Sequence, residues 1–456
     1  MSSHQSSITF YGGTESVTGS NFLFETGGLK ILIDCGLFQG CRICGDLNIE
    51  SFPYDPSSID ALFITHGHLD HVGRIPKLVR EGFRGVIYST PPTRDLGELV
   101  LIDSMGIMEK ESKREHTELL YNKEDIAKAR GLWRAVPYHE PISLAEGVTV
   151  RLKDSGHILG SAMIELDRDG KKIIFTGDLG NSPAPLLHDT ETVSDADYMI
   201  IESVYGDRNH PSRAEQKGLL KQIIEETITS GGALMIPAFS IERTQVLLSE
   251  LNELVEHKRI PPVPIFLDSP LAIKATAIYD KYEKYFNDKT KDIIKSGDDI
   301  FNFPGLKSTL RTEESKAIND VPNPKVIIAG SGMSAGGRII HHELRYLRDP
   351  KSTLLLIGYQ APGTLGRELR DGAKEVTILG ERVPVRANIL EISGYSGHKD
   401  SDALVEFISH DKDRAQKIFV VMGELKSATF LAQKIRDTLS MEAIVPKKGE
   451  KIEILF

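Results

Sequence analysis

One six-residue segment, HGHLDH at residues 66–71, constrains this chain more than any other feature, and it directly follows the apolar run ALFIT. The whole sequence has 14 histidines, so three of them and an aspartate in six positions are not expected by chance. Alternate histidines on an extended turn can direct His66 and His68 at one metal ion, while Asp70 and His71 face a second. The alternative is a polar loop of solvated histidines. The spacing favours a metal centre with room for two adjacent ions.

Zinc takes about four ligands, so one segment cannot complete two sites and other strand ends must contribute. His157 lies in KDSGHILGSA between two predicted strands, where flanking glycines allow close approach of the backbone. Asp178 follows the strand KKIIF in TGDLG, where a carboxylate can bridge two cations. Each residue alone is typical of an ordinary turn. Together with residues 66–71, they are interpreted as metal ligands.

Three further polar residues stand at or just after predicted strands. Asp34 ends KILID, Glu202 ends YMIIE, and His398 follows in EISGYSGHKD. A lone residue of this kind is usually a satisfied hydrogen-bond partner. Cleavage of a phosphate ester would nevertheless need a general acid beside the metals, and a histidine oriented by a carboxylate is the usual solution.

The chain has 456 residues, more than the ~100–200 of one ordinary domain, which predicts two domains or one domain with a large insertion. Up to about residue 205 the sequence consists of short strands with turn residues between them, with helices over RIPKLVREG and much of 93–130. From about 212, long amphipathic helices alternate with buried strands such as ALMIPAF and KVIIAGS. This pattern predicts an α/β layered domain with a parallel sheet. Short strands resume after VRANILEIS.

Composition narrows the functional classes. Hydrophobic residues at 40% and charged residues at 26% match a soluble globular chain. No uncharged apolar run reaches the ~18 residues of a membrane helix, and MSSHQSSITF does not resemble a signal peptide. We therefore expect a cytoplasmic protein with no membrane partner. The net charge of −10 gives no global attraction for a polyanion, so nucleic-acid binding would need local cations or metal.

The three cysteines, Cys35, Cys41 and Cys44, cannot form a disulfide framework, and their number suits a reducing compartment. Residues 41–44 form a single CxxC, without the second pair that a structural zinc site requires. We interpret this segment as a plain loop with free thiols.

The ordered set His66-x-His68-x-Asp70-His71, His157 and Asp178 resembles the metallo-β-lactamase superfamily, whose αββα fold holds two zinc ions at one sheet edge. Glu202, a long insertion and then Ser-Gly-His398-x-Asp400 resemble its nucleic-acid-processing branch, the β-CASP family. The strings VTGSN, ESVYGDRNHP, PAFSIERTQ, DSPLA, GSGMSAGGR and GYQAPGTLGREL are similar to the short bacterial and archaeal relatives of the endonuclease subunit of pre-mRNA cleavage and polyadenylation. The resemblance implies an α/β protein with a metallo-β-lactamase domain at 1–206 and 394–456 and an inserted β-CASP domain at 207–393.

By position, the resemblance assigns roles to the candidate residues. The first zinc would be held by His66, His68 and His157, the second by Asp70 and His71, with Asp178 as the bridge and Asp34 behind the ligands. His398, oriented by Glu202, would protonate the departing oxygen. The implied function is a zinc-dependent ribonuclease that hydrolyses single-stranded RNA in processing or decay, leaving a 5′-phosphate and a 3′-hydroxyl. Endonucleolytic or 5′-exonucleolytic action, and a monomer or a homodimer, are left open.

One position departs from the family pattern. Family members usually place a last zinc-ligating histidine before Gly-Glu near the C-terminus, and Met422 occupies that place in KIFVVMGELKSA. A thioether is neutral and soft, a poor partner for zinc beside carboxylates. The expected outcomes are a weakly held second ion, water in the vacant position, or an RNA-binding protein that cuts slowly.

The segment GSGMSAGGR at 330–338 joins the strand KVIIA to the helix IIHHELRYL. Its small residues and the helix N-terminus can receive a nucleic-acid phosphate, with Ser331, Ser334 and Arg338 as contacts and Arg367 as a further candidate. The competing interpretation is a tight turn that needs glycine for its geometry.

The same segment supports a rival function. Gly332-Met-Ser334-Ala-Gly336 satisfies GxSxG between a strand and a helix, and Asp371 and His398 follow in the order of a serine hydrolase. This reading leaves the histidines of 66–71 without a role. A zinc hydrolase of small esters is a second rival, and the long insertion with its flanking Glu202 and His398 argues against it.

Overall fold

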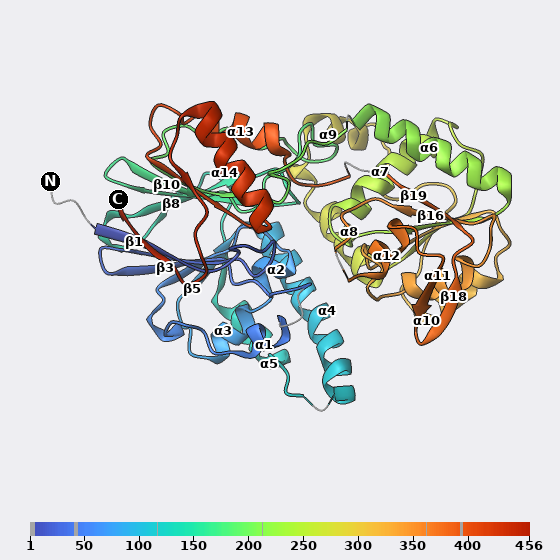
Figure 1. The fold of residues 1–456 in the computed structure, drawn as a ribbon, viewed down its shortest axis with the longest axis horizontal. Helices are drawn as coiled ribbons and strands as arrows, with labels where there is room; N and C mark the ends of the chain where they lie inside the picture. Colours follow the sequence, from blue (N-terminus) through green and yellow to red (C-terminus); the bar gives the residue numbers. More distant parts are fainter. Residues whose placement is uncertain (1–4, 41–43, 116, 212, 362, 393–394) are drawn as a thin grey trace. The chain divides into compact units, whose positions relative to one another are not determined.

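The computed structural model describes residues 5–40, 44–115, 117–211, 213–361, 363–392 and 395–456. The chain forms two compact units, Met1–Asn209 with His398–Phe456, and the inserted His210–Gly397 (Figure 1). The division falls a few residues after each of the expected boundaries at 206 and 393. The first unit therefore contains both ends of the chain.

The first unit is built on two seven-stranded sheets. The first sheet has, in spatial order, β22 (Lys451–Leu455), β1 (Gln5–Gly12), β2 (Asn21–Thr26), β3 (Leu29–Ile33), β4 (Ala61–Phe63), β5 (Val86–Ser89) and β6 (Trp133–Ala135). The second has β21 (Ala443–Ile444), β20 (Lys417–Val421), β11 (Tyr198–Glu202), β10 (Lys171–Phe175), β9 (Ala162–Arg168), β8 (Thr149–Asp154) and β7 (Ile142–Ser143). In each sheet an antiparallel part continues into a parallel part, β3 to β6 in the first and β10, β11, β20 and β21 in the second.

Helices cover the outer faces of both sheets, which completes the expected αββα layering (Figure 1). They are α1 (Cys44–Ile49), α2 (Leu69–Val72), α3 (Ile75–Arg80), α4 (Pro91–Glu115), α5 (Lys123–Leu132), α13 (Ser401–Ser409) and α14 (Leu425–Leu439), with 3-10 turns η1 (Pro56–Ser58) and η2 (Ala145–Gly147). Between the sheets lies a core of residues such as Phe10, Phe24, Phe175 and Phe419. Strands β10 and β11 are buried on both faces because the core covers one side and α13 and α14 the other.

The inserted unit has the predicted parallel sheet, in the order β14 (Leu306–Ser308), β13 (Ile265–Asp268), β15 (Lys325–Ala329), β12 (Ala233–Pro237), β16 (Thr353–Leu356) and β19 (Asn388–Glu391). Its helices are α6 (Arg213–Ser230), α7 (Arg243–Glu256), α8 (Pro270–Lys281), α9 (Asp288–Lys295), α10 (Thr312–Ala317), α11 (Ile339–Tyr346) and α12 (Leu365–Arg370), with η3 (Glu283–Tyr285) and η4 (Ile318–Asp320). A separate antiparallel hairpin pairs β17 (Glu375–Ile378) with β18 (Glu381–Pro384). Parallel strands bring their carboxyl ends to one edge, so the 330–338 segment after β15 lies at that edge.

The structure also bears on the expectations for the cysteines and for membrane-spanning helices. Cys44 is disulfide-bonded, which corrects the expectation of free thiols in this segment; Cys41 lies outside the described residues. Cys35 is a buried free cysteine, and burial raises the pKa of its thiol to about 12. Among the helices of the described residues, none combines the length and apolarity needed to cross a membrane.

Candidate metal centre

The predicted first metal site assembles from three separate loops. His66 follows β4, His68 caps the short helix α2, His157 lies between β8 and β9, and Asp178 follows β10. One ligand atom from each of these four residues lies within 4.8 Å of the others. The Asp178 Oδ2 atom is 3.5 Å from His66 Nε2 and 3.6 Å from His157 Nε2. Three imidazole nitrogens and a carboxylate oxygen are a donor set that zinc accepts.

Asp70, His71 and Asp34 are also brought together, on the other side of Asp178. His71 Nδ1 contacts Asp34 Oδ2 at 2.7 Å, and its Nε2 lies 3.6 Å from Asp178 Oδ1 and 3.8 Å from Asp70 Oδ2. His71 Nε2 and Asp178 Oδ1 are buried and have no hydrogen-bond partner among the described residues. A buried imidazole nitrogen and a carboxylate oxygen that face each other unpaired are costly unless a cation or proton lies between them.

Electrostatics in this cluster follow from its burial and its mixed charge. Burial alone lowers the pKa of His71, but the carboxylates of Asp178, Asp34 and Asp70 outweigh it and raise that pKa well above the usual value. For His66, burial and the neighbouring His71 lower the pKa well below the usual range. Burial raises the pKa of Asp70 to about 6. The cluster thus already supplies a neutral imidazole, the form that binds a metal, at His66.

Met422 lies inside the core at this end of the unit. Its side chain is 2% exposed, and its backbone N–H donates to the carbonyl of Gly13 at 2.6 Å. With Asp34, Thr65 and Thr176 it lines an internal cavity of about 10 Å³. A thioether here offers no nitrogen or carboxylate donor, so the described donors for a second cation are Asp70, His71 and Asp178. The residues fit one full zinc site and one site short of a ligand.

Glu202 and His398 form the expected pair. His398 Nδ1 lies 3.2 Å from each carboxylate oxygen of Glu202, and Glu202 Oε1 also accepts the backbone N–H of Leu179 at 2.6 Å. Glu202 is fully buried, and burial raises the pKa of its carboxyl. The side chain of His398 is 14% exposed, and Nδ1 also lies 3.9 Å from Asp178 Oδ2. Nδ1 faces the carboxylate, so Nε2 is the ring nitrogen directed away from Glu202.

Sequence reasoning missed the residues that support this centre. Thr65 Oγ1 lies 2.9 Å from Asp34 Oδ2 and 3.1 Å from His66 Nδ1, and Ser20 Oγ donates to Asp34 Oδ2 at 3.0 Å. The Thr65 backbone N–H donates to Asp34 Oδ1 at 2.8 Å. Such contacts fix the orientation and tautomer of ligating imidazoles. The only available signal was a hydroxyl residue directly before the first histidine.

The predicted phosphate contacts lie in the inserted unit, and the structure gives each a different environment. The Ser334 hydroxyl is buried and donates to Glu343, while Ser331 Oγ accepts the N–H of Ala335 at 3.0 Å. Arg338 bridges to Asp268 at 2.7 Å, and Arg367 to Asp371 at 2.6 Å. All four therefore have intramolecular partners. Their contact with RNA stays a prediction.

The serine-hydrolase interpretation is wrong in its geometry. An elbow nucleophile must expose its hydroxyl and share a hydrogen bond with a histidine. Ser334 is 2% exposed and bonds to a glutamate, and the His398 Nδ1 atom contacts Glu202. The competing view of 330–338 as a structural turn gains support from Gly337, whose φ of +70° favours glycine.

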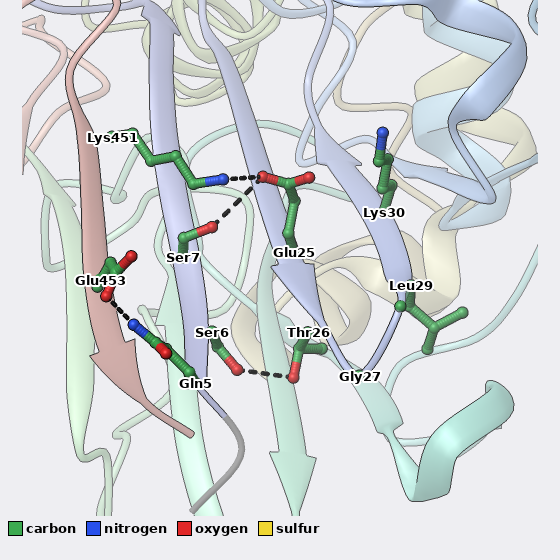
Figure 2. A pocket seen from close by; sticks show the side chains of 11 residues that line it. Gln5, Ser6, Ser7, Glu25, Thr26, Gly27, Leu29, Lys30, Lys451 and Glu453 are labelled. Atoms are coloured by element: carbon green, nitrogen blue, oxygen red, sulfur yellow. Dashed lines mark hydrogen bonds and ion pairs between the residues drawn. The ribbon is translucent and has the colours of Figure 1, made fainter.

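A second hollow, of about 340 Å³, lies at the opposite end of the first sheet (Figure 2). Strand β3 begins in this hollow at Leu29 and ends next to Asp34, so the hollow and the metal centre are separated by the length of that strand. Lys451 pairs with Glu25 at 2.7 Å, and Gln5 pairs with Glu453 (Figure 2). These side chains satisfy one another, which is typical of a solvated sheet face.

Comparison with known proteins agrees with this geometry. Residues 23–204 match the metallo-beta-lactamase superfamily domain, 244–369 the Beta-Casp domain, and 382–446 the Zn-dependent metallo-hydrolase RNA specificity domain. Ribonuclease TTHA0252 of Thermus thermophilus is 36% identical over 98% of this chain and 100% of its own length. The chain belongs to the β-CASP family of the metallo-β-lactamase superfamily. It is therefore a metal-dependent hydrolase.

Other relatives match over nearly the same part of the chain. An RNase J-like protein of Methanocaldococcus jannaschii is 34% identical over 98% of this chain and 99% of its own length. Transcription termination factor FttA of Methanosarcina mazei is 32% identical over 98% of this chain and 71% of its own length. A solved protein of unknown function from Enterococcus faecalis covers 99% of this chain and is itself fully covered, with a TM-score of 0.57 and 12% identity, a likeness of fold alone.

Proposed function

We propose that this chain is a zinc-dependent ribonuclease that hydrolyses phosphodiester bonds of single-stranded RNA in RNA processing or decay. The observation that carries the proposal is the buried cluster of His66, His68, His157 and Asp178 beside the Glu202–His398 pair. The match to an RNA specificity domain and relatives named as ribonucleases support RNA as the substrate. RNA as the substrate also favours a cytoplasmic location.

The proposed ligands are His66, His68 and His157 for the first zinc, with Asp178 shared by both sites. Bound zinc would supply positive charge for the phosphoryl group and would lower the pKa of water to near 7. Asp34 Oδ2 forms a hydrogen bond with His71 Nδ1. This contact fixes the ring, so that Nε2 points toward Asp178. The chain thus holds its donor atoms in place before any substrate arrives.

The proposed general acid is His398. Glu202 accepts from Nδ1, which fixes the ring and stabilises its protonated form, and the Leu179 N–H holds the Glu202 carboxylate in turn. The proton on Nε2 is then directed away from the carboxylate, where it can pass to the oxygen that leaves the phosphorus. The family resemblance implies that the leaving atom is the 3′ oxygen, so that the products carry a 5′-phosphate and a 3′-hydroxyl.

Met422 favours a second candidate, a protein of the same fold that binds RNA and cleaves it slowly or not at all. The proposed second site has Asp70, His71 and Asp178, and the residue that the family resemblance assigns to the remaining ligand position is Met422, a thioether. Weak occupancy of that site would leave developing phosphoryl charge less well compensated. The two candidates differ in turnover and agree on the substrate.

The deciding experiment incubates the purified protein with end-labelled single-stranded RNA, with and without a chelator, and separates the products by length. Zinc-dependent cleavage that the chelator abolishes is the expected result. Discrete internal products indicate an endonuclease, and mononucleotides from one end indicate an exonuclease. RNA binding with no product at saturating zinc would reject the ribonuclease and leave the binding protein. Sedimentation of the same preparation tests the predicted homodimer.

A further inference from the structure

We propose that Asp178, Glu202 and His398 form an additional cation site, distinct from the two catalytic positions, and that zinc bound there inhibits cleavage. The inference rests on the proposed function, because it assigns an inhibitory role to the groups that handle the proton. One ligand atom of each of the three residues lies within 4.8 Å of the other two. The separations from His398 Nδ1, 3.2 Å to Glu202 Oε2 and 3.9 Å to Asp178 Oδ2, are shorter than the ~4.4 Å that two donors at 2.2 Å from one ion can span.

The three side chains point toward one another from separate elements of the first unit. Glu202 ends β11, Asp178 follows β10, and His398 forms an isolated bridge with Gly180. The His398 Nδ1 atom lies 3.2 Å from Glu202 and 3.9 Å from Asp178 Oδ2. Their exposed side-chain fractions are 0%, 3% and 14% for Glu202, Asp178 and His398, so the site is largely dry but open on the histidine side.

The donor chemistry selects the class of cation. Two carboxylates carry enough negative charge for a divalent ion, and an imidazole nitrogen favours zinc-like transition metals over magnesium or calcium. The Asp178 atom that faces His398 is Oδ2, at 3.9 Å from Nδ1, while Oδ1 faces His71 Nε2 at 3.6 Å. Asp178 Oδ2, which also lies 3.5 Å from His66 Nε2, would therefore be shared between the first catalytic ion and the additional ion.

Occupation of this site would remove the orientation of the proposed acid. To bind the cation, the imidazole releases its Nδ1 proton to solvent, and the Nδ1–Glu202 hydrogen bond is lost. Nε2 then belongs to a neutral, metal-bound ring and has no strongly acidic proton to pass to the leaving oxygen. We expect cleavage to rise with zinc until the catalytic positions fill and to fall again as the weaker site fills.

The test is equilibrium dialysis against a zinc series, followed by measurement of bound metal per chain. The set comprises the wild type, His398→Ala, Glu202→Gln and the control His410→Ala, whose histidine is exposed at the end of α13. At limiting zinc all four should bind the same amount. At excess zinc, His398→Ala and Glu202→Gln should each bind one ion per chain fewer than the wild type and the control.

Equal stoichiometry in all four proteins at excess zinc overturns the proposal. Loss of metal at limiting zinc in His398→Ala overturns it as well, because the histidine would then be a ligand of the catalytic centre. The Glu202→Gln variant keeps the size of the side chain, so it guards against a fold defect in the other variant. Failure of the proposed function would look different, with no RNA cleavage at any zinc concentration while the difference in stoichiometry persists.

Discussion

Replacement of Met422 by histidine tests the second metal site directly. In the absence of zinc, the new imidazole would lie in the core beside an internal cavity of about 10 Å³, among Asp34, Thr65 and Thr176. That volume is close to the limit for holding one water molecule, so the ring would keep at least one polar atom unsatisfied. A buried unsatisfied polar group costs about 1–3 kcal/mol, and the free energy of unfolding of the metal-free variant should fall by that amount.

Zinc should reverse this loss if Met422 occupies a ligand position. Binding to the folded state alone adds about 2.7 kcal/mol at a free concentration 100 times the dissociation constant, which is enough to offset most or all of the penalty. The completed site should also bind its zinc more tightly, and RNA cleavage at limiting zinc should rise with occupancy.

The assay compares urea unfolding in chelator and in zinc for the wild type, Met422→His and the control Met422→Leu. Leucine conserves volume and apolarity without adding a donor, so it should stay within about 1.5 kcal/mol of the wild type and gain nothing from zinc beyond the wild-type response. Equal zinc stoichiometry in Met422→His and wild type, with no recovery of stability in zinc, would refute the assignment of Met422 to the second site.

Four further predictions follow from the described contacts. His68→Ala should lower the zinc content measured by metal analysis, and unchanged zinc would remove residues 66–71 from the site. His398→Ala should reduce cleavage by ~10²–10⁴-fold while keeping RNA binding and the zinc bound at limiting metal, as expected for loss of a general acid; RNA cleavage at the wild-type rate would contradict that role. Thr65→Val removes the hydroxyl between Asp34 and His66 and should weaken zinc affinity ~10–100-fold in a competition titration. An unchanged dissociation constant for zinc would show that the hydroxyl does not support the site. Burial raises the pKa of Glu343 to about 7, so the folded state holds a proton that the unfolded state loses near the usual carboxyl pKa of 4.5, and the free energy of unfolding should fall as pH rises between those values. Glu343→Gln should weaken the dependence of the free energy of unfolding on pH in this range. An unchanged dependence would show that another group causes it.

The candidate metal ligands can be picked out from the sequence because they lie where strands end, and the structure brings them together. Residues 66–71 contain four ligand candidates in one turn, and His157 and Asp178 each stand beside a recognisable strand. The carboxyl ends of parallel strands lie at one edge of a sheet, so residues that directly follow such strands in the sequence are expected to come together in the fold. The parallel sheet of the inserted unit is predictable for the same reason, since its strands alternate with amphipathic helices.

The supporting contacts could not be predicted, because they depend on packing between distant segments. Glu202 and His398 are 196 positions apart, and only the resemblance to the β-CASP family paired them. The hydrogen bonds of Thr65 to Asp34 cross 31 positions between neighbouring strands. Burial of Ser334 against Glu343 likewise depends on how helix α11 packs. A glycine-rich loop has no hydrophobic periodicity from which this burial could be predicted.

The carboxylates around His71 bear on whether the proposed second site can bind an ion when Met422 stands where the family usually has a histidine. Asp34, Asp70 and Asp178 still surround this imidazole, and two of the atoms that face each other have no hydrogen-bond partner among the described residues. Such a buried arrangement costs free energy unless a cation or proton compensates the carboxylates. A chain that had abandoned the second ion would gain stability by replacing these groups with apolar side chains. Because these carboxylates raise the pKa of His71 well above its usual value, a proton on the ring compensates them when no ion is bound, and a cation can replace that proton. The arrangement therefore supports the proposal of a second site that binds zinc in competition with a proton, with lower affinity than the first.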